Sequence, residues 1–214
     1  AEFARFVNPE VKNIEQIPAL AGFADRIDIA NPELMEEYMK IASSQGYTKK
    51  LLSDISLVID YVSSKLKFME AREYIEVLFG EPRIKQKQLV ELMAPYIREL
   101  DEKGFEIGKA NVKLDKFGKL HLQFLHFEEF FPGFGFFPKP GRIVGMLHDS
   151  LQIEKGISNL ITVGIMESAM TIRATNESNF SVHEFIKYLN QKIPEAFVEG
   201  GGHNNAGSIN FLPN

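Results

Sequence analysis

The apolar residues of this chain change their spacing near residue 104. Between residues 31 and 103 they recur every three or four positions, which is typical of amphipathic helices. Beyond residue 104, short apolar runs between turn-forming residues predict strands over 105–114, 120–127, 160–166, 170–175 and 208–212, and helices over 142–151 and 181–194. A helical segment followed by strands that alternate with helices predicts an α/β protein.

Local signals place the ends of the first helices. Asn31 before Pro32 is a favourable helix start, because the asparagine side chain caps the first turn and proline fits its first position. Thr48 begins a second helix, and a third over 71–79 is followed by residues 80–82, a Gly-Glu-Pro sequence that interrupts helices. A fourth helix is predicted over 83–103.

Charge and composition exclude several classes of site. Acidic residues outnumber basic ones by 29 to 24, so a nucleic acid has to be bound by a local basic patch rather than by the net charge of −5. The absence of cysteine excludes disulfides and thiolate metal sites, which is usual for intracellular proteins. No apolar run is long enough to span a membrane, so we expect a cytoplasmic protein without a membrane partner.

Three consecutive glycines, Gly200, Gly201 and Gly202, precede His203 and Asn204. Without Cβ atoms a turn can adopt positive φ and present its N–H groups to an anion, and the histidine adds a side-chain donor. A glycine-rich turn that merely reverses the chain is the alternative.

Arg173 ends a largely apolar strand, so its guanidinium needs a partner. An ion pair with a glutamate is one interpretation. A bound phosphate is the other, because the planar set of donors suits a phosphate group.

The run 199–208 resembles the Gly-Gly-Gly-His signature of the DHH-associated C-terminal domain, found in RecJ-like nucleases and related phosphoesterases. In that family the glycine loop holds a phosphate of the nucleic acid, and an arginine in a Ser-x-Arg strand assists. Thr171 and Arg173 resemble that strand, and the order of elements agrees over 104–212. The resemblance therefore implies a mixed-sheet α/β domain over 104–214 whose substrate-binding residues are Thr171, Arg173, Gly200, Gly201, Gly202, His203 and Asn204.

Asp25 lies in a segment of small apolar residues, where an ion pair with Arg26 is the simple interpretation. The segment also resembles the last motif of the catalytic DHH domain, which makes Asp25 a candidate Mn²⁺ or Mg²⁺ ligand. The earlier Asp-x-Asp and Asp-His-His motifs have no counterpart here. We therefore expect an N-terminally truncated chain that is inactive alone, with the end of a DHH catalytic domain over 1–30 and a helical connector over 31–103.

The resemblance implies that the intact protein is a metal-dependent exonuclease of single-stranded DNA or RNA in archaeal DNA replication or repair. Its implied partner is a subunit of the GINS replication complex or the Hef helicase. Two alternatives stay open. One is an oligoribonuclease or cyclic-dinucleotide phosphodiesterase of the same superfamily, and the other is an interaction module without catalysis.

Two further features are ambiguous. Phenylalanines interleaved with glycine and proline over 127–142 suit packing, a protein partner or stacking on bases, the last with Lys139 and Arg142 on the backbone. His148 and Asp149 are a possible acid–base pair, but adjacent residues of a helix do not face one another.

Overall fold

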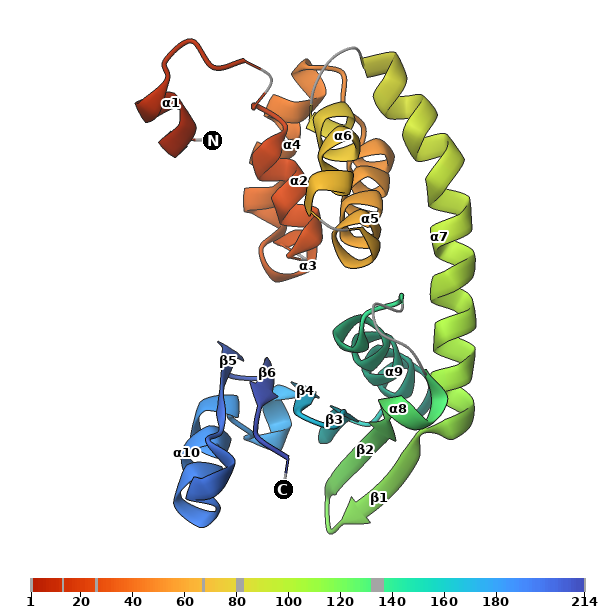
Figure 1. Ribbon diagram of the computed structural model, residues 1–214, viewed down its shortest axis with the longest axis vertical. Coiled ribbons are helices and arrows are strands. Elements are labelled where there is room, and N and C mark those ends of the chain that lie inside the picture. The colour runs from red at the N-terminus through yellow and green to blue at the C-terminus, as the bar shows by residue number, and fades with distance from the viewer. Residues whose placement is uncertain are drawn as a thin grey trace. The chain divides into compact units, whose positions relative to one another are not determined.

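The computed structural model describes residues 2–12, 14–25, 27–66, 68–79, 83–131 and 137–213. They belong to two compact units, Ala1–Glu99 and Leu100–Asn214 (Figure 1). The first is helical, and the second carries a six-stranded mixed sheet with helices. The predicted α/β class is confirmed.

The first unit is helical, with α2 and α6 packed against α5, and α3 and α4 against α2. Its elements are α1 (Glu2–Val7), α2 (Ile17–Ala24), α3 (Ile27–Ala30), α4 (Pro32–Ser44), α5 (Lys49–Lys65), α6 (Phe68–Phe79) and the first part of α7 (Arg83–Asn111). The predicted Asn31 cap is confirmed, since its side chain accepts a hydrogen bond from the Leu34 N–H at 3.2 Å; Thr48, at the predicted start of the second helix, accepts one from the Leu51 N–H at 3.1 Å. The apolar residues Leu52, Ile55, Val58 and Val62 of α5 are almost fully buried.

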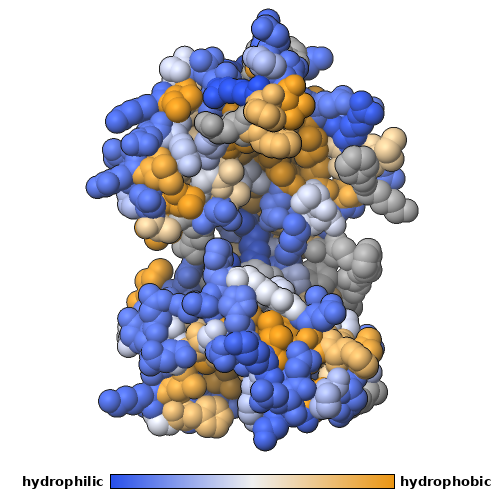
Figure 2. Space-filling model, turned by 90° about the vertical axis from the view of Figure 1, so that its left-hand side faces the viewer, coloured by the Kyte–Doolittle hydropathy of each residue, from blue (hydrophilic) through white to orange (hydrophobic). Residues whose placement is uncertain are grey.

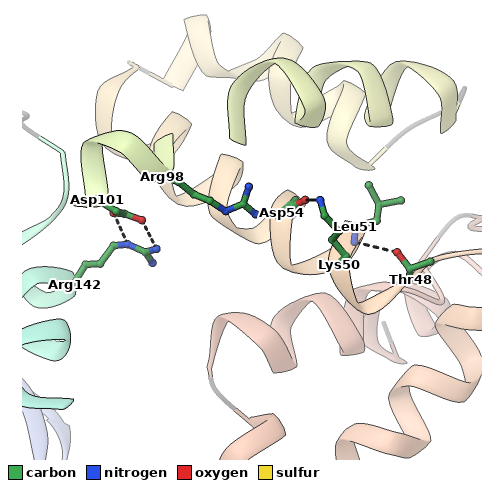
Figure 3. A network of polar contacts seen from close by, with 7 residues as sticks. All are labelled: Thr48, Lys50, Leu51, Asp54, Arg98, Asp101 and Arg142. Atoms are coloured by element: carbon green, nitrogen blue, oxygen red, sulfur yellow. Dashed lines mark hydrogen bonds and ion pairs between the residues drawn. The ribbon is translucent and has the colours of Figure 1, made fainter. Parts of the chain in front are cut away.

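One buried carboxylate joins α5 to α7 within this unit. Asp54 accepts a hydrogen bond from the Lys50 ammonium at 2.8 Å and pairs with Arg98 of α7 (Figure 3). Its side chain is only 4% exposed, so the two cations offset the cost of burying its charge.

The helix α7 continues beyond the predicted end at residue 103, and the strand expected to begin at residue 105 begins at Lys113 instead. Gly104 and Gly108 are four residues apart and therefore lie on one face of α7. A Cβ at Gly104 would lie 2.6 Å from the Pro138 ring, and one at Gly108 would lie 3.0 Å from Ile143. These glycines allow close packing. Helix propensity alone treats them only as residues that destabilise a helix.

The sheet of the second unit has the strand order β1-β2-β3-β4-β6-β5. Its strands are β1 (Lys113–Phe117), β2 (Leu120–His126), β3 (Leu160–Ile165), β4 (Ala169–Ala174), β5 (Glu199–His203) and β6 (Ala206–Asn210). Only β2 and β3 pair in parallel among these strands; the other neighbours are antiparallel. The edges of the sheet are therefore β1 and β5.

Helices cover both faces of this sheet. On one face α9 (Pro140–Lys155) packs on β3 and β4, above a core that includes Leu125, Phe127, Phe131, Ile143, Val144 and Leu147. On the other face α10 (Val182–Lys192) packs with β5 and β6, around a core of Ile161, Ile172, Ala174, Val182, Ala196, Val198 and Ile209. The short elements α8 (Phe127–Phe130), η1 (Asn176–Ser178) and η2 (Pro194–Ala196) complete the unit.

The phenylalanine-rich stretch of 127–142 is partly accounted for by this packing. Phe127, Phe131 and Phe137 are buried, which favours packing for these three rings. Arg142 forms a bidentate pair with Asp101 of α7, at 2.7 Å through Nε and 2.5 Å through its terminal nitrogen (Figure 3). Residues 132–136 lie outside the described part of the chain.

Within the described ranges, no helix is both long enough and apolar enough to cross a bilayer.

Candidate phosphate-binding site

A row of residues, all polar except Ala206, crosses the sheet of the second unit. The strand register places Gln123 beside Thr162, Thr162 beside Arg173, Arg173 beside Ala206, and Ala206 beside His203. Residues paired in this way point to the same face of a sheet. Arg173 and His203 are therefore on one face, separated by two strand spacings, or about 10 Å.

A second row lies two residues along the strands, on the same face. It places Thr171 beside Ser208, and Ser208 beside Gly201. Among the predicted site residues, Thr171, Arg173, Gly201 and His203 thus share one face. Gly200 and Gly202 occupy the alternate positions of β5, which belong to the other face.

The three glycines form a strand, so the expectation of a glycine loop is wrong. They lie within β5, at the edge of the sheet, and the chain turns only at Asn204 and Asn205. Gly202 has φ +133°, which favours glycine. A Cβ at Gly200 would collide with the Ser208 carbonyl oxygen, and one at Gly202 with that of Ala206, whereas a Cβ at Gly201 would have no heavy atom within 4 Å.

The turn after His203 is fixed by its own carbonyl groups. The Asn205 carbonyl accepts a hydrogen bond from the Ala174 N–H at 2.7 Å, and the Asn204 carbonyl accepts one from the Val182 N–H at 2.9 Å. The Asn205 side-chain amide also donates to Asn176. The side chains of His203 and Asn204 remain exposed. The hairpin is therefore held to both β4 and α10 while its predicted ligand groups face solvent.

Arg173 is half-buried on β4, beneath α9. A Cβ at Gly145 of α9 would lie 3.9 Å from its Nε, so the absence of a side chain there leaves room for the guanidinium. Its guanidinium has no hydrogen bond or ion pair with any residue in the described ranges, which leaves the predicted pairing with a glutamate without support there. A half-buried cation in this state is available for an anionic ligand.

A pocket of about 330 Å³ opens beside Arg173. It is lined by residues of α9, of the end of β4 with η1, and of the start of β6: His148, Asp149, Gln152, Arg173, Ala174, Thr175, Asn176, Glu177, Asn205 and Ala206. His148 and Asp149 are adjacent in α9, and such neighbours on a helix do not face each other. Both residues nevertheless line the same pocket, because two side chains can contribute to one pocket wall without facing each other.

His148 is held from below by two buried polar residues. The Thr162 hydroxyl donates to the Gln123 side-chain oxygen at 2.9 Å, so its remaining lone pair accepts from the His148 Nδ1–H, also at 2.9 Å. Burial lowers the pKa of His148 below its usual value, and Arg173 lowers it further against the opposing effect of Asp149. The imidazole is therefore neutral at pH 7, with Nε2 as an acceptor.

The predicted metal ligand Asp25 is exposed and follows the last residue of α2. Its predicted partner Arg26 lies outside the described residues. Within the described ranges, no group of three or more His, Asp or Glu side chains is placed to hold a metal ion. The residues described here thus do not by themselves fit the metal centre that the resemblance implies.

Comparison with known proteins relates the chain to DHH-domain proteins. No protein-family model matches it. An uncharacterized protein of Methanocaldococcus jannaschii is 27% identical over 234 residues, covering 99% of this chain and 30% of that protein. The DHH-domain structure of a member of a family of ribosomal proteins is 32% identical, with a TM-score of 0.84 over 99% of this chain and 49% of that structure.

Two RecJ structures share the fold at lower identity. RecJ from Thermus thermophilus, in complex with Mg²⁺, matches 94% of this chain and 32% of its own, with 15% identity and a TM-score of 0.55. Exonuclease RecJ bound to manganese matches 94% of this chain and 51% of its own, with 14% identity and a TM-score of 0.50. The chain has a DHH-type, RecJ-like fold and spans between about a third and a half of these proteins.

Proposed function

We propose that this chain is the substrate-holding part of a DHH-superfamily phosphodiesterase that hydrolyses single-stranded DNA or RNA. In this proposal Arg173 and His203 bind phosphate groups of the strand, Gly201 borders the same surface, and Thr171 lies buried on the same face of the sheet. The intact protein uses Mn²⁺ or Mg²⁺ in the proposal, as the metals in the two RecJ structures suggest. The role in replication or repair stays a prediction.

The observation that carries the proposal is the state of Arg173. This half-buried guanidinium has no partner among the described residues, and it shares a sheet face with His203 and with the open position at Gly201. Two donors about 10 Å apart, two strand spacings, are within the reach of one nucleic-acid backbone, whose phosphates are separated by several bonds. The overall negative charge makes such a local contact necessary.

A protein partner is the second part of the proposal. Large apolar side chains are exposed on α1 and α7, where Phe6 is 86% and Leu92 77% exposed. Figure 2 shows apolar patches between hydrophilic areas on one side of the molecule. Such patches support a contact with the rest of the longer protein or with a partner, for which a GINS subunit or Hef is the candidate.

Equilibrium binding of a short single-stranded oligonucleotide tests the proposal. Arg173→Ala should weaken binding about 10- to 100-fold, because a charge-assisted contact is lost, and should reduce the salt slope by about one. Lys116→Ala is the matched control, since it removes the same charge from β1 at the opposite edge of the sheet. Equal affinity of the Arg173 variant and the unmodified chain would remove Arg173 from the site.

A further inference from the structure

The pocket beside Arg173 is chemically unlike the surface around it. Carboxylates of Asp149 and Glu177 border it, together with the amide side chains of Gln152 and Asn176. Arg173 is the one cationic side chain of its lining. A phosphate group suits Arg173, but the two carboxylates of the lining repel a second anionic group in the pocket.

The buried polar chain below the pocket adds a third acceptor. Because Thr162 uses its hydroxyl hydrogen on Gln123, the proton of His148 sits on Nδ1. Nε2 then carries a lone pair, so it is the atom of this ring that can accept a hydrogen bond from a ligand. Two buried polar residues hold this uncharged imidazole in one orientation, and packing alone does not explain why polar groups are buried there.

The volume limits the size of the occupant. A volume of about 330 Å³ lies at the lower end of the roughly 300–1,000 Å³ that small-molecule sites occupy, which suits a ligand as small as a nucleobase with its sugar. The occupant has to bring hydrogen-bond donors to the acceptors and an anionic group to Arg173. A nucleotide with an exocyclic amino group on its base has both.

We propose that this pocket is a nucleoside subsite that prefers bases carrying an amino group, with the attached phosphate on Arg173. The inference rests on the proposed function, because it requires Arg173 to hold a phosphate of the substrate. The amino group of cytosine, adenine or guanine donates to Glu177 or to His148 Nε2. Uracil and thymine present a carbonyl oxygen in the place of the cytosine amino group, and the acceptors of the pocket repel that oxygen.

The test compares cytidine and uridine monophosphate, which have nearly the same size and differ at this group. Calorimetric titration of the 214-residue chain should show cytidine monophosphate binding about tenfold tighter. Glu177→Gln keeps the shape and removes the charge, so it should weaken cytidine monophosphate about five- to tenfold and leave inorganic phosphate unchanged. Glu195→Gln, an equally exposed carboxylate in the 3₁₀ helix η2, is the matched control and should change neither.

The two proposals fail in different ways. Equal binding of the two nucleotides, or an unaffected Glu177→Gln variant, would overturn the subsite. If Arg173→Ala still abolishes binding in that case, the phosphate site remains supported. If Arg173→Ala binds inorganic phosphate and both nucleotides as the unmodified chain does, the phosphate site itself is wrong.

Discussion

The two halves of the candidate site are built by different means. In the β5–β6 hairpin the positions are fixed by the backbone: two of the three glycines lie where a Cβ would collide with carbonyl oxygens of β6. On β4 the positions are fixed by side chains: Arg173 lies under α9, and the buried Gln123, Thr162 and His148 form a hydrogen-bonded chain next to it.

The difference separates glycines that strand pairing requires from a glycine that strand pairing does not require. Gly200 and Gly202 are needed for the hairpin to pair at all, which is a structural role. Gly201 lies on the face of Thr171 and has open space before it, so no contact with the described residues requires the absence of a side chain there. A run of identical residues thus contains two distinct roles, and each can be tested by a single methyl group.

Gly202→Ala should have the largest effect. It places a Cβ at φ +133° and against the Ala206 carbonyl oxygen, so we expect a loss of about 2–4 kcal/mol in the free energy of unfolding of the second unit. Hydrogen exchange of the β5 and β6 amides measures the loss. Gly201→Ala is the control and should change stability by less than about 0.5 kcal/mol. Equal losses in both variants would contradict the division of the glycines.

The side-chain half is tested by Thr162→Val, which keeps the shape and removes the hydroxyl. The His148 Nδ1–H and the Gln123 oxygen would then be buried without the hydroxyl that bridges them, which should cost about 2 kcal/mol. Urea unfolding followed at β3 and β4 measures it. Ser208→Ala, at an exposed residue, is the control and should leave the free energy of unfolding nearly unchanged. Thr175→Val would not serve, because the Thr175 hydroxyl bonds both the N–H and the carbonyl of Leu160.

These contrasts also show what the sequence could and could not predict. Helices with capping residues, such as the one beginning after Asn31, follow from local rules and are confirmed. The end of α7 was predicted eight residues too early, because Gly104 and Gly108 act through their contacts with Pro138 and Ile143. The shared face of Arg173 and His203 depends on strand order, since β6 comes between them in space although it follows both in sequence.

The candidate site shows the same limit. Arg173 and the glycines could be selected by residue type and by resemblance, although whether they bind substrate stays a prediction. His148 could be selected only as a possible acid–base partner of Asp149, because its hydrogen-bonded chain depends on Thr162 of β3 and Gln123 of β2, which are distant in sequence. A histidine flanked by apolar residues of a helix, at Leu147 and Leu151, was the available signal that it is buried.

Gly201→Ala should also separate the two halves in binding. If the strand of nucleic acid approaches β5 as proposed, a methyl group on the face of Thr171 and Arg173 should weaken a single-stranded oligonucleotide about tenfold without changing stability. Fluorescence anisotropy at one fixed salt concentration measures the change. Unchanged binding would restrict the phosphate contact to the side-chain half.

The smallest effect concerns the pH dependence of the side-chain half. Because the pKa of His148 is lowered in the folded state, the unfolded chain binds the proton more readily, and stability rises with pH. The contribution of His148 to the free energy of unfolding is fully present above the unfolded pKa of about 6.5 and is lost as the pH falls through the lower pKa of the folded state. One proton limits the slope to about 1.4 kcal/mol per pH unit. Urea unfolding at about pH 7.5 and about pH 5.5, on either side of that unfolded value, should therefore show a lower free energy of unfolding at the lower pH. His148→Gln should reduce this difference. His183→Gln, which changes an exposed residue of α10, is the control and should retain it. An equal pH dependence in the His148 variant would mean that His148 does not contribute to it, and that other groups cause the destabilisation at the lower pH.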